Sequence, residues 1–303
     1  MTTQQFRAGF VSFVGRPNVG KSTLTNALVG EKIAITSAKP QTTRRAIRGI
    51  VHRDQGQLII VDTPGLHRPR TLLGERLNNL VESTLGDVDV IGMCFPANEK
   101  IGPGDTFINQ QLDGFRRAKK VAIITKTELA DRETLTAQLL AVQGLREWDA
   151  IIPVSALGGG ANGREQLGSL TDLLIDLMPV SPELYPKDII TDESVEDRIC
   201  EYIREAALEG VRDELPHSIA VTIDEMSKRE DQELTDIHAN IWLERDSQKG
   251  IIIGPKGSRL KAVGQTSRME IERLIGHKVF LSIRVKVAPD WQRDPKQLGK
   301  LGF

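Results

Sequence analysis

The chain has 303 residues, of which 39% are apolar and 27% are charged, and this is the composition of an ordinary globular protein that is long enough for two domains with separate cores. Its formal net charge of −1 indicates no class of partner, because patches of opposite sign cancel in a sum. The sequence contains neither a signal peptide nor a run of about 18 apolar residues that could span a bilayer, so we expect a cytoplasmic protein. Cys94 and Cys200 have no Cys or His at ligand spacing, and we interpret both as small buried residues in a reducing compartment.

The first part of the chain alternates short apolar runs with amphipathic stretches. Five runs are typical of strands that are buried on both faces: residues 9–15, 57–65, 88–95, 120–126 and 150–156. Helical periods lie between them, at residues 21–29, 72–85, 106–115 and 134–143. This alternation predicts an α/β fold with a mostly parallel sheet flanked by helices, and ligands bind such sheets at the carboxyl ends of the strands.

The first strand ends in a glycine-rich loop, GRPNVGKST at residues 15–23, which fits the pattern G-x-x-x-x-G-K-[ST]. Its glycines let backbone N–H groups turn inward around a phosphate, and the N-terminus of the next helix adds its dipole. Lys21 would reach the β- and γ-phosphates. The alternative is a glycine turn without a ligand, but the loop follows a buried strand and opens a helix, as phosphate binding requires. The predicted contacts are Gly15, Arg16, Pro17, Asn18, Val19, Gly20, Lys21, Ser22 and Thr23.

A second loop, DTPG, predicts the binding site of a magnesium ion that Ser22 would also hold. Asp62 ends the next strong strand and can hold the water shell of Mg²⁺, and the N–H of Gly65 can contact the γ-phosphate. Between the loops, a threonine of KPQTTRR (residues 39–45) could close on Mg²⁺ while the γ-phosphate is present; both Thr42 and Thr43 qualify, and we favour Thr43 over Thr42. The alternative for residues 39–45 is a basic flexible loop that binds no ligand. The predicted metal ligands are Ser22, Thr43 and Asp62, and Thr63 and Pro64 complete the predicted nucleotide contacts of this loop.

The second half of the chain differs in charge. The prolines of LMPVSPELYP (residues 177–186) mark a linker, so we predict one domain at residues 1–180 and, with the linker, a second at residues 181–303. Residues 181–244 carry 6 basic and 18 acidic side chains, whereas residues 245–303 carry 13 basic and 5 acidic ones. No acidic residue lies between Asp246 and Glu270. A solvated face would mix the two signs, so we interpret this stretch as a surface that binds nucleic acid.

Within the acid-free stretch lies GIIIGPKGSRLKAVG, residues 250–264. A G-x-x-G loop lets the backbone approach sugar-phosphate closely, as in KH modules, which clamp about four nucleotides. The surrounding pattern predicts a helix at 195–209, strands at 218–225 and 237–245, a buried strand or helix at 250–253, a helix at 258–275 and a strand at 278–287. This order predicts an α+β domain with a three-stranded sheet and helices on one face. The predicted RNA contacts are Gly254, Pro255, Lys256, Gly257, Arg259 and Lys261. Trp242 and Trp291 could stack on bases, but we favour core packing for both.

These motifs together resemble the Era family, bacterial Ras-like GTPases with a C-terminal type II KH domain. GRPNVGKSTL, QTTR, DTPGLH, SAL and IIIGPKGSRLK match the family pattern in order and spacing over residues 6–303. The resemblance implies a P-loop GTPase domain that binds GTP or GDP with Mg²⁺, followed by a KH domain that binds the 3′ end of 16S ribosomal RNA. It further implies a monomer that assists assembly and maturation of the 30S ribosomal subunit in the cytoplasm. A peripheral association with the inner face of the cell membrane stays open.

The resemblance also sets an expectation for hydrolysis. Leu66 occupies the position at which Ras-like proteins carry the glutamine that orients the attacking water, so we expect slow intrinsic turnover. Members with this substitution often bind K⁺ beside the phosphates, and the asparagine implicated there matches Asn18; a turn residue without a ligand is the alternative. We therefore predict catalytic roles for Lys21, Thr43 and Asn18.

Most of the GTPase superfamily reads guanine with N-K-x-D, but residues 125–128 of IITKTELAD are Thr-Lys-Thr-Glu. Lys126 could still pack on the base, Glu128 could accept from guanine, and the N–H of Ala156 in Ser155-Ala156-Leu157 would contact O6. Thr125 lacks the amide that ties this loop to the phosphate loop, so we expect a looser pocket with reduced guanine affinity. Two classes of function follow: a GTPase switch that controls RNA binding, or an RNA-binding assembly factor whose nucleotide site has drifted.

Overall fold

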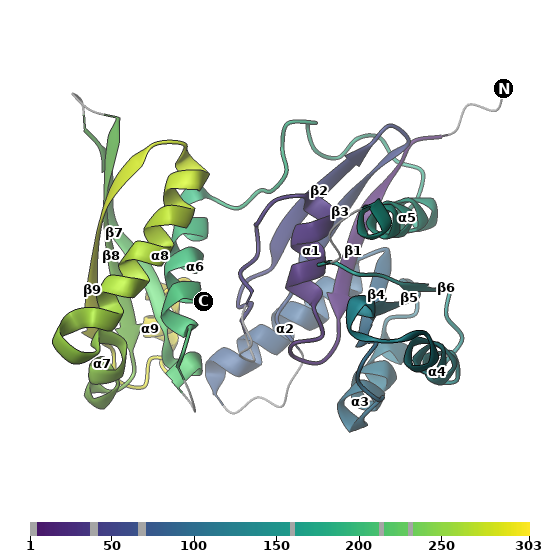
Figure 1. The fold of residues 1–303 in the computed structure, drawn as a ribbon, viewed down its shortest axis with the longest axis horizontal. Helices are drawn as coiled ribbons and strands as arrows, with labels where there is room; N and C mark the ends of the chain where they lie inside the picture. The colour runs from purple at the N-terminus through teal and green to yellow at the C-terminus, as the bar shows by residue number, and fades with distance from the viewer. Residues whose placement is uncertain (1–4, 37–41, 66–70, 158–160, 212–214, 230–232) are drawn as a thin grey trace. The chain divides into compact units, whose positions relative to one another are not determined.

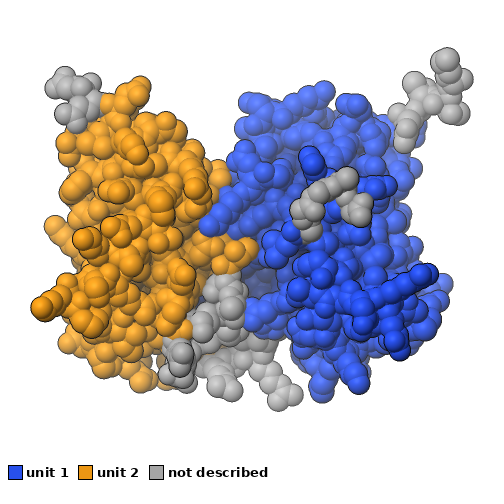
Figure 2. Space-filling model, in the orientation of Figure 1, with its two compact units in different colours: residues 1–34, 43–68, 77–192 blue, residues 35–42, 69–76, 193–303 orange. Residues whose placement is uncertain are grey.

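The structure is a computed structural model that describes residues 5–36, 42–65, 71–157, 161–211, 215–229 and 233–303 (Figure 1). The chain divides into two compact units (Figure 2): unit 1 is Met1–Ala34, Thr43–Arg68 and Leu77–Asp192, and unit 2 is Ile35–Thr42, Pro69–Arg76 and Glu193–Phe303. Residues 181–192 thus group with unit 1, whereas the sequence predicts them as part of the second domain. The predicted domain boundary between residues 180 and 181 stays a prediction. Among the described residues, no helix is both long and apolar enough to cross a membrane.

Unit 1 is built on a six-stranded sheet with the order β2-β3-β1-β4-β5-β6. All neighbouring strands are parallel except β2 and β3, which run antiparallel. The strands are β1 (Arg7–Val14), β2 (Ile47–Arg53), β3 (Gly56–Asp62), β4 (Val90–Pro96), β5 (Lys119–Thr125) and β6 (Ala150–Pro153). The five predicted strands and the mostly parallel sheet are confirmed. The edge strand β2 was missed because polar side chains interrupt its short apolar pattern, IRGIVHR.

Helices cover both faces of this sheet (Figure 1). They are α1 (Lys21–Val29), α2 (Leu72–Asp87), α3 (Pro103–Gln111), α4 (Arg132–Gln143) and α5 (Ala161–Leu177), of which α5 was not predicted. Leu24 of α1 and Leu170 of α5 are buried against one face, whereas Val81, Ile108 and Val142 of α2, α3 and α4 are buried against the other. Since both faces are covered, the central strands are largely apolar on both faces, which is why alternation is absent from their sequences.

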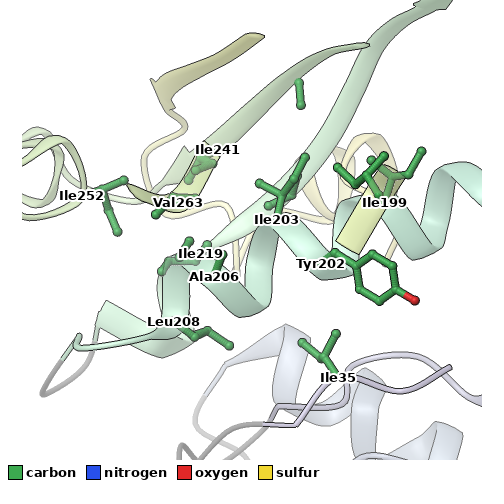
Figure 3. Close-up of a cluster of buried hydrophobic side chains, with 14 of the residues drawn as sticks. Ile35, Ile199, Tyr202, Ile203, Ala206, Leu208, Ile219, Ile241, Ile252 and Val263 are labelled. Atoms are coloured by element: carbon green, nitrogen blue, oxygen red, sulfur yellow. The ribbon is translucent and has the colours of Figure 1, made fainter. Parts of the chain in front are cut away.

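Unit 2 contains a three-stranded sheet with the order β7-β8-β9. Strand β7 (Ala220–Lys228) is antiparallel to β8 (Leu234–Leu243), which is parallel to β9 (Lys278–Val287). The helices are α6 (Val195–Leu208), α7 (Asp246–Ile253), α8 (Ser258–Ile275) and the short α9 (Pro295–Lys300). In the core, Ile203 of α6 and Val263 of α8 pack with Ile241 of β8 (Figure 3). The predicted order of elements is confirmed, and residues 250–253 are the end of α7.

The two tryptophans of unit 2 differ in burial. Trp291 is fully buried, stacks on Phe303 with ring centroids 5.5 Å apart, and donates its indole N–H to the carbonyl oxygen of Ser218 at 3.2 Å. Core packing is therefore confirmed for Trp291. Trp242 is only partly buried, because its side chain leaves the sheet on the face opposite the core residue Ile241.

The two cysteines also differ. Cys94 lies in β4 and is fully buried, and this burial raises the pKa of its thiol to about 12. Cys200 of α6 is only partly buried, so the prediction of burial is correct for Cys94 and wrong for Cys200. Cys200 packs at the margin of the core of unit 2, since α6 carries it at the edge of its apolar face.

Candidate nucleotide site and RNA-binding groove

Glycine shapes the loop between β1 and α1. Gly15 has a φ of 150°, and a Cβ there would lie 2.9 Å from the carbonyl oxygen of Cys94. Gly20, with a φ of 100°, leads the chain into α1, whose first residue is Lys21. The Lys21 ammonium donates to the carbonyl oxygens of Gly15 at 3.0 Å and Arg16 at 3.1 Å. The lysine therefore lies across the loop at a helix N-terminus, where anions are attracted.

Three oxygen atoms converge beside Lys21. The hydroxyls of Ser22 and Thr43 donate to Oδ2 of Asp62 at 2.9 and 3.0 Å, and the two hydroxyl oxygens are 3.3 Å apart. Cis ligands of an octahedral Mg²⁺ at its usual bond length are about 3 Å apart, so this spacing fits the ion. Oδ1 of Asp62 is buried and has no hydrogen-bond partner among the described residues. Of the two candidate threonines, Thr43 is the one whose hydroxyl joins this cluster.

Burial shifts the pKa of both Lys21 and Asp62 in this site. Burial lowers the pKa of the Lys21 ammonium, although the nearby Asp62 carboxylate acts in the opposite direction. Burial likewise raises the pKa of Asp62, against the effects of Lys21 and of the hydrogen bonds from Ser22 and Thr43. Each charged form is thus poorly solvated, and a phosphate beside Lys21 and a cation beside Asp62 would compensate for the lost water.

The remaining residues of the phosphate loop lie outside the cluster of Ser22, Thr43 and Asp62. The Arg16 guanidinium donates to Asp105 at 2.8 Å and to Glu99 at 3.1 Å, so these two carboxylates hold its side chain. Asn18 has a φ of 64°, a left-handed conformation that asparagine tolerates better than most residues. The loop also contains Pro17, the buried Val19 and, in the first turn of α1, Thr23.

Thr125 ties the end of β5 to the phosphate loop. Its buried hydroxyl donates to the carbonyl oxygen of Val19 at 2.6 Å. The expectation that this loop loses its tie was therefore wrong: a hydroxyl, although shorter than an amide, reaches the carbonyl because the two loops are adjacent. Lys126 follows with a φ of 57°, and Glu128 is exposed in a single 3-10 turn, Thr127–Leu129. Asp131 is not an alternative base reader, because its carboxylate caps α4 by accepting the N–H of Thr134 at 2.8 Å.

The loop after β6 contributes Ser155, Ala156 and Leu157. Ser155 is buried, and its N–H donates to Oε1 of Gln166 at 2.9 Å. Ala156 is partly buried, and Leu157 is 73% exposed. The hydrogen bond from Ser155 to Gln166 thus anchors the backbone of this loop on α5, and Ala156 next to it is partly exposed.

The DTPG loop is described only up to Gly65. Thr63 and Pro64 are buried and Gly65 is partly buried. The hydroxyls of Thr63 and Ser12 are 3.4 Å apart, so Thr63 supports the end of β3 rather than facing outward. Leu66, on which the expectation of slow turnover rests, lies outside the described residues.

In unit 2, the loop GPKG joins α7 to α8. Gly254 and Gly257 have φ values of 72° and 75°, and Lys256 between them has a φ of 51°. A Cβ on Gly254 would lie 2.7 Å from Cβ of Arg259, so glycine is required for this approach. Pro255 and Lys256 are exposed. The loop therefore presents backbone and one ammonium group at the N-terminus of α8, which suits a phosphate of RNA.

Arg259 has a structural role that the sequence did not indicate. Its guanidinium donates to the carbonyl oxygens of Ala207 at 3.2 Å and Glu209 at 2.7 Å, at the end of α6. Carbonyls at a helix C-terminus lack intrahelical donors, so a cation there is stabilising. Its predicted contact with RNA stays a prediction, and Lys261, which is exposed on α8, is better placed for one.

A groove of about 420 Å³ runs between α8 and β9 beside this loop. Its apolar floor contains Leu260, Leu281 and Ile283, and Lys261 and Arg268 supply positive charge. An apolar floor can hold bases, and cations at its side can hold phosphates. Lys261 was predicted from the charge of the sequence, whereas the apolar floor was not, although the alternation of Leu281, Ile283 and Val285 on β9 could have indicated it. The groove is lined by Gly257, Leu260, Lys261, Gly264, Gln265, Arg268, Leu281 and Ile283.

Comparison with known proteins identifies both units. Residues 10–126 match the model of the 50S ribosome-binding GTPase family, and residues 214–292 match the KH domain family. GTPase Era of Leifsonia xyli is 70% identical over 98% of this chain and 99% of its own length. GTPase Era of Streptomyces coelicolor is 61% identical over 98% and 95%, and that of Mycolicibacterium smegmatis is 60% identical over 99% of both.

Two solved structures are similar over almost the whole chain. One is an Aquifex aeolicus Era variant bound to GDP and AlF4⁻, and the other is Era in complex with MgGDPNP and nucleotides 1506–1542 of 16S ribosomal RNA. Each is 34% identical, has a TM-score of 0.91, and covers 98% of this chain and 99% of its own. With the phosphate loop, the GPKG loop and this extent of identity, the chain belongs to the Era family of GTPases with a C-terminal KH domain.

Proposed function

We propose that this protein is a GTP-hydrolysing switch that binds 16S ribosomal RNA near its 3′ end and assists assembly of the 30S ribosomal subunit. The observation that carries the proposal is the convergence of Ser22, Thr43 and Asp62 at 2.9–3.3 Å beside the Lys21 ammonium. A related Era is solved with MgGDPNP and a 16S fragment, which supports both halves of the proposal. We further propose that the protein acts in the cytoplasm as a monomer.

Each residue of the nucleotide site would have its own role in GTP hydrolysis. Lys21 would bind the β- and γ-phosphates, and backbone N–H groups of the phosphate loop would surround them. Ser22 and Thr43 would bind Mg²⁺ directly, and Asp62 would orient its water shell; the ion neutralises charge that develops on the phosphate oxygens. With no polar atom in the Leu66 side chain to orient water, turnover is slow. Asn18 would hold a K⁺ that adds positive charge beside the phosphates.

The loop after β5 would recognise guanine. Lys126 would pack on the base, and the exposed Glu128 would accept from guanine N1–H and the N2 amine. Thr125 stands where most of the GTPase superfamily carries asparagine, and its hydroxyl ties this loop to Val19, which supports a formed pocket. The N–H of Ala156 would donate to O6.

RNA would bind along the groove between α8 and β9. Bases would lie on Leu281 and Ile283, while Lys256, Lys261 and Arg268 would contact phosphates. A second candidate function, an RNA-binding assembly factor whose nucleotide site is only structural, is favoured by one observation: Glu128 stands where most of the GTPase superfamily carries aspartate.

A turnover assay separates these two functions. GTP hydrolysis by the parent chain is compared with Lys21→Ala, and we expect the variant to lose an order of magnitude or more, because positioning and charge supply most of the catalysis in this reaction class. Calorimetry checks that the variant is folded. Equal turnover in a folded Lys21→Ala variant would contradict the GTPase proposal, and absence of magnesium-dependent turnover in the parent would favour the second function.

A further inference from the structure

Asp105 of α3 is a buried carboxylate that holds a side chain of the phosphate loop. Its side chain is 1% exposed, and both of its oxygens accept a hydrogen bond. Oδ2 accepts the backbone N–H of Gly102 at 2.9 Å, which caps α3, and Oδ1 accepts the Nε–H of Arg16 at 2.8 Å. Hydrogen bonds between charged groups are the strong ones, and at a buried carboxylate water competes little for them. Asp105 therefore fixes the guanidinium of Arg16 at the start of α3.

The aliphatic stem of Arg16 lies against the backbone of the same helical turn. A Cβ on Gly104, the second residue of α3, would lie 2.9 Å from Cδ and 3.2 Å from Cγ of Arg16. Glycine is a poor helix former, but at this position it leaves the space through which the arginine reaches Asp105. The side chain of Arg16 is thus held along its stem by the backbone of α3 and at its end by Asp105.

The main chain of Arg16 contacts the lysine that would bind the phosphates. Its carbonyl oxygen accepts a hydrogen bond from Nζ of Lys21 at 3.1 Å. Arg16 is followed by Pro17, and a residue before proline is restricted to extended backbone conformations. A side chain that is held at its end and along its stem leaves this restricted backbone little further freedom. The contact with α3 therefore acts on the carbonyl group that Lys21 contacts.

We infer that Asp105 is a positioning residue for nucleotide binding: through Arg16 it holds the phosphate loop in the shape that receives the phosphates, and Gly104 makes room for this contact. The inference rests on the proposed function and adds to it a residue of α3 that itself touches no phosphate. The phosphate loop would hold the β-phosphate that GDP and GTP share. Loss of the contact should therefore weaken the binding of both nucleotides by the same factor and change the chemical step little.

The first test uses the full chain and the Asp105→Asn variant. An amide has one oxygen where the carboxylate has two, so Gly102 and Arg16 compete for it, and the charge that attracts the guanidinium is lost. We expect the KM for GTP and the Kd for GDP to rise by the same factor, roughly three- to tenfold, the equivalent of one weakened hydrogen bond. The kcat should stay within about twofold of the parent value, and since turnover is slow, KM reports binding.

The second test separates the contact from the stability of the helix. Gly104→Ala keeps Asp105 but places a Cβ against the stem of Arg16, whereas alanine favours a helix more than glycine does. We expect the Kd for GDP to rise roughly threefold or more, without a fall in the melting temperature of the nucleotide-free protein. Gly168→Ala in α5 is the matched control, because a Cβ there would meet no atom of the described residues within 4 Å. Its affinity for GDP should equal that of the parent.

The outcomes separate the inference from the proposed function. A parent-like Kd for GDP in a folded Asp105→Asn or in Gly104→Ala, with normal turnover in the parent, would overturn the inference and leave the GTPase proposal intact. A fall in kcat at unchanged KM would also overturn it, since the contact would then act on the chemical step. The same holds for an equal loss of affinity in Gly168→Ala. If Asp105→Asn does not fold, Gly104→Ala decides alone, and a parent chain that binds no guanine nucleotide would remove both proposals.

Discussion

Replacing Thr125 by Val removes the hydroxyl that joins the base-reading loop to the phosphate loop and changes little else in shape. The lost hydrogen bond spans 2.6 Å between residues that are 3% and 1% exposed, so the Val19 carbonyl oxygen is left without this donor in a buried site. An unsatisfied buried acceptor costs about 1–3 kcal/mol. At about 2–4 °C per kcal/mol for a domain of 150–250 residues, the melting temperature should fall by roughly 2–12 °C. GDP affinity should fall by up to about tenfold, because the pocket and the phosphate loop are no longer held together.

The assay is differential scanning calorimetry without nucleotide, together with isothermal titration of GDP. Thr171→Val is the matched control: Thr171 is also buried, but its hydroxyl donates to the Leu167 carbonyl oxygen within α5, which the helix already satisfies. We expect the control to retain GDP affinity. If Thr125→Val matches Thr171→Val in both melting temperature and GDP affinity, the tie between the two loops contributes nothing and the reasoning fails.

Two further predictions concern the RNA loop and the monovalent cation. Lys256→Asp should weaken binding of single-stranded RNA and make its salt dependence shallower, because aspartate tolerates the left-handed backbone at φ 51° but repels phosphate. The control is Lys187→Asp, which makes the same change of charge on an exposed residue of the linker. If the RNA titrations of Lys256→Asp superimpose on those of the parent at low and high salt, the KH assignment of this loop is wrong. GTP turnover should rise when K⁺ replaces Na⁺ at constant ionic strength, and Asn18→Ala should abolish the difference; equal parent rates in the two salts would refute the K⁺ site.

The parts that the sequence predicted correctly depend on local backbone geometry. Gly15 and Gly254 each occupy a left-handed or crowded position that only glycine fills, so a short pattern identifies the turn around each. Helix α8 begins at Ser258 and ends at Ile275, as its periodicity predicted, because an amphipathic face and a following glycine specify both ends.

The parts that the sequence did not predict depend on contacts between distant residues. The tie from Thr125 to Val19 spans 106 positions, and no pattern reveals that a hydroxyl reaches a carbonyl so far along the chain. Arg259 was interpreted as an RNA contact because charge can be read from sequence, whereas its partners at the end of α6 cannot. Strand β2 was missed for a related reason: its pairing with β3 determines its structure, not its own polar pattern.

The central claim, that this chain is a guanine-nucleotide switch, is tested most directly by competition of GDP against ADP for the nucleotide site. Glu128 can accept both guanine N1–H and the N2 amine, whereas adenine offers neither donor and would leave the carboxylate facing an acceptor, so GDP should compete far better than ADP. Glu128→Ala should abolish this preference, and Glu128→Asp should leave it unchanged or strengthen it. Near-equal affinities of the parent chain for GDP and ADP would contradict the claim and favour an RNA-binding assembly factor with a vestigial nucleotide site.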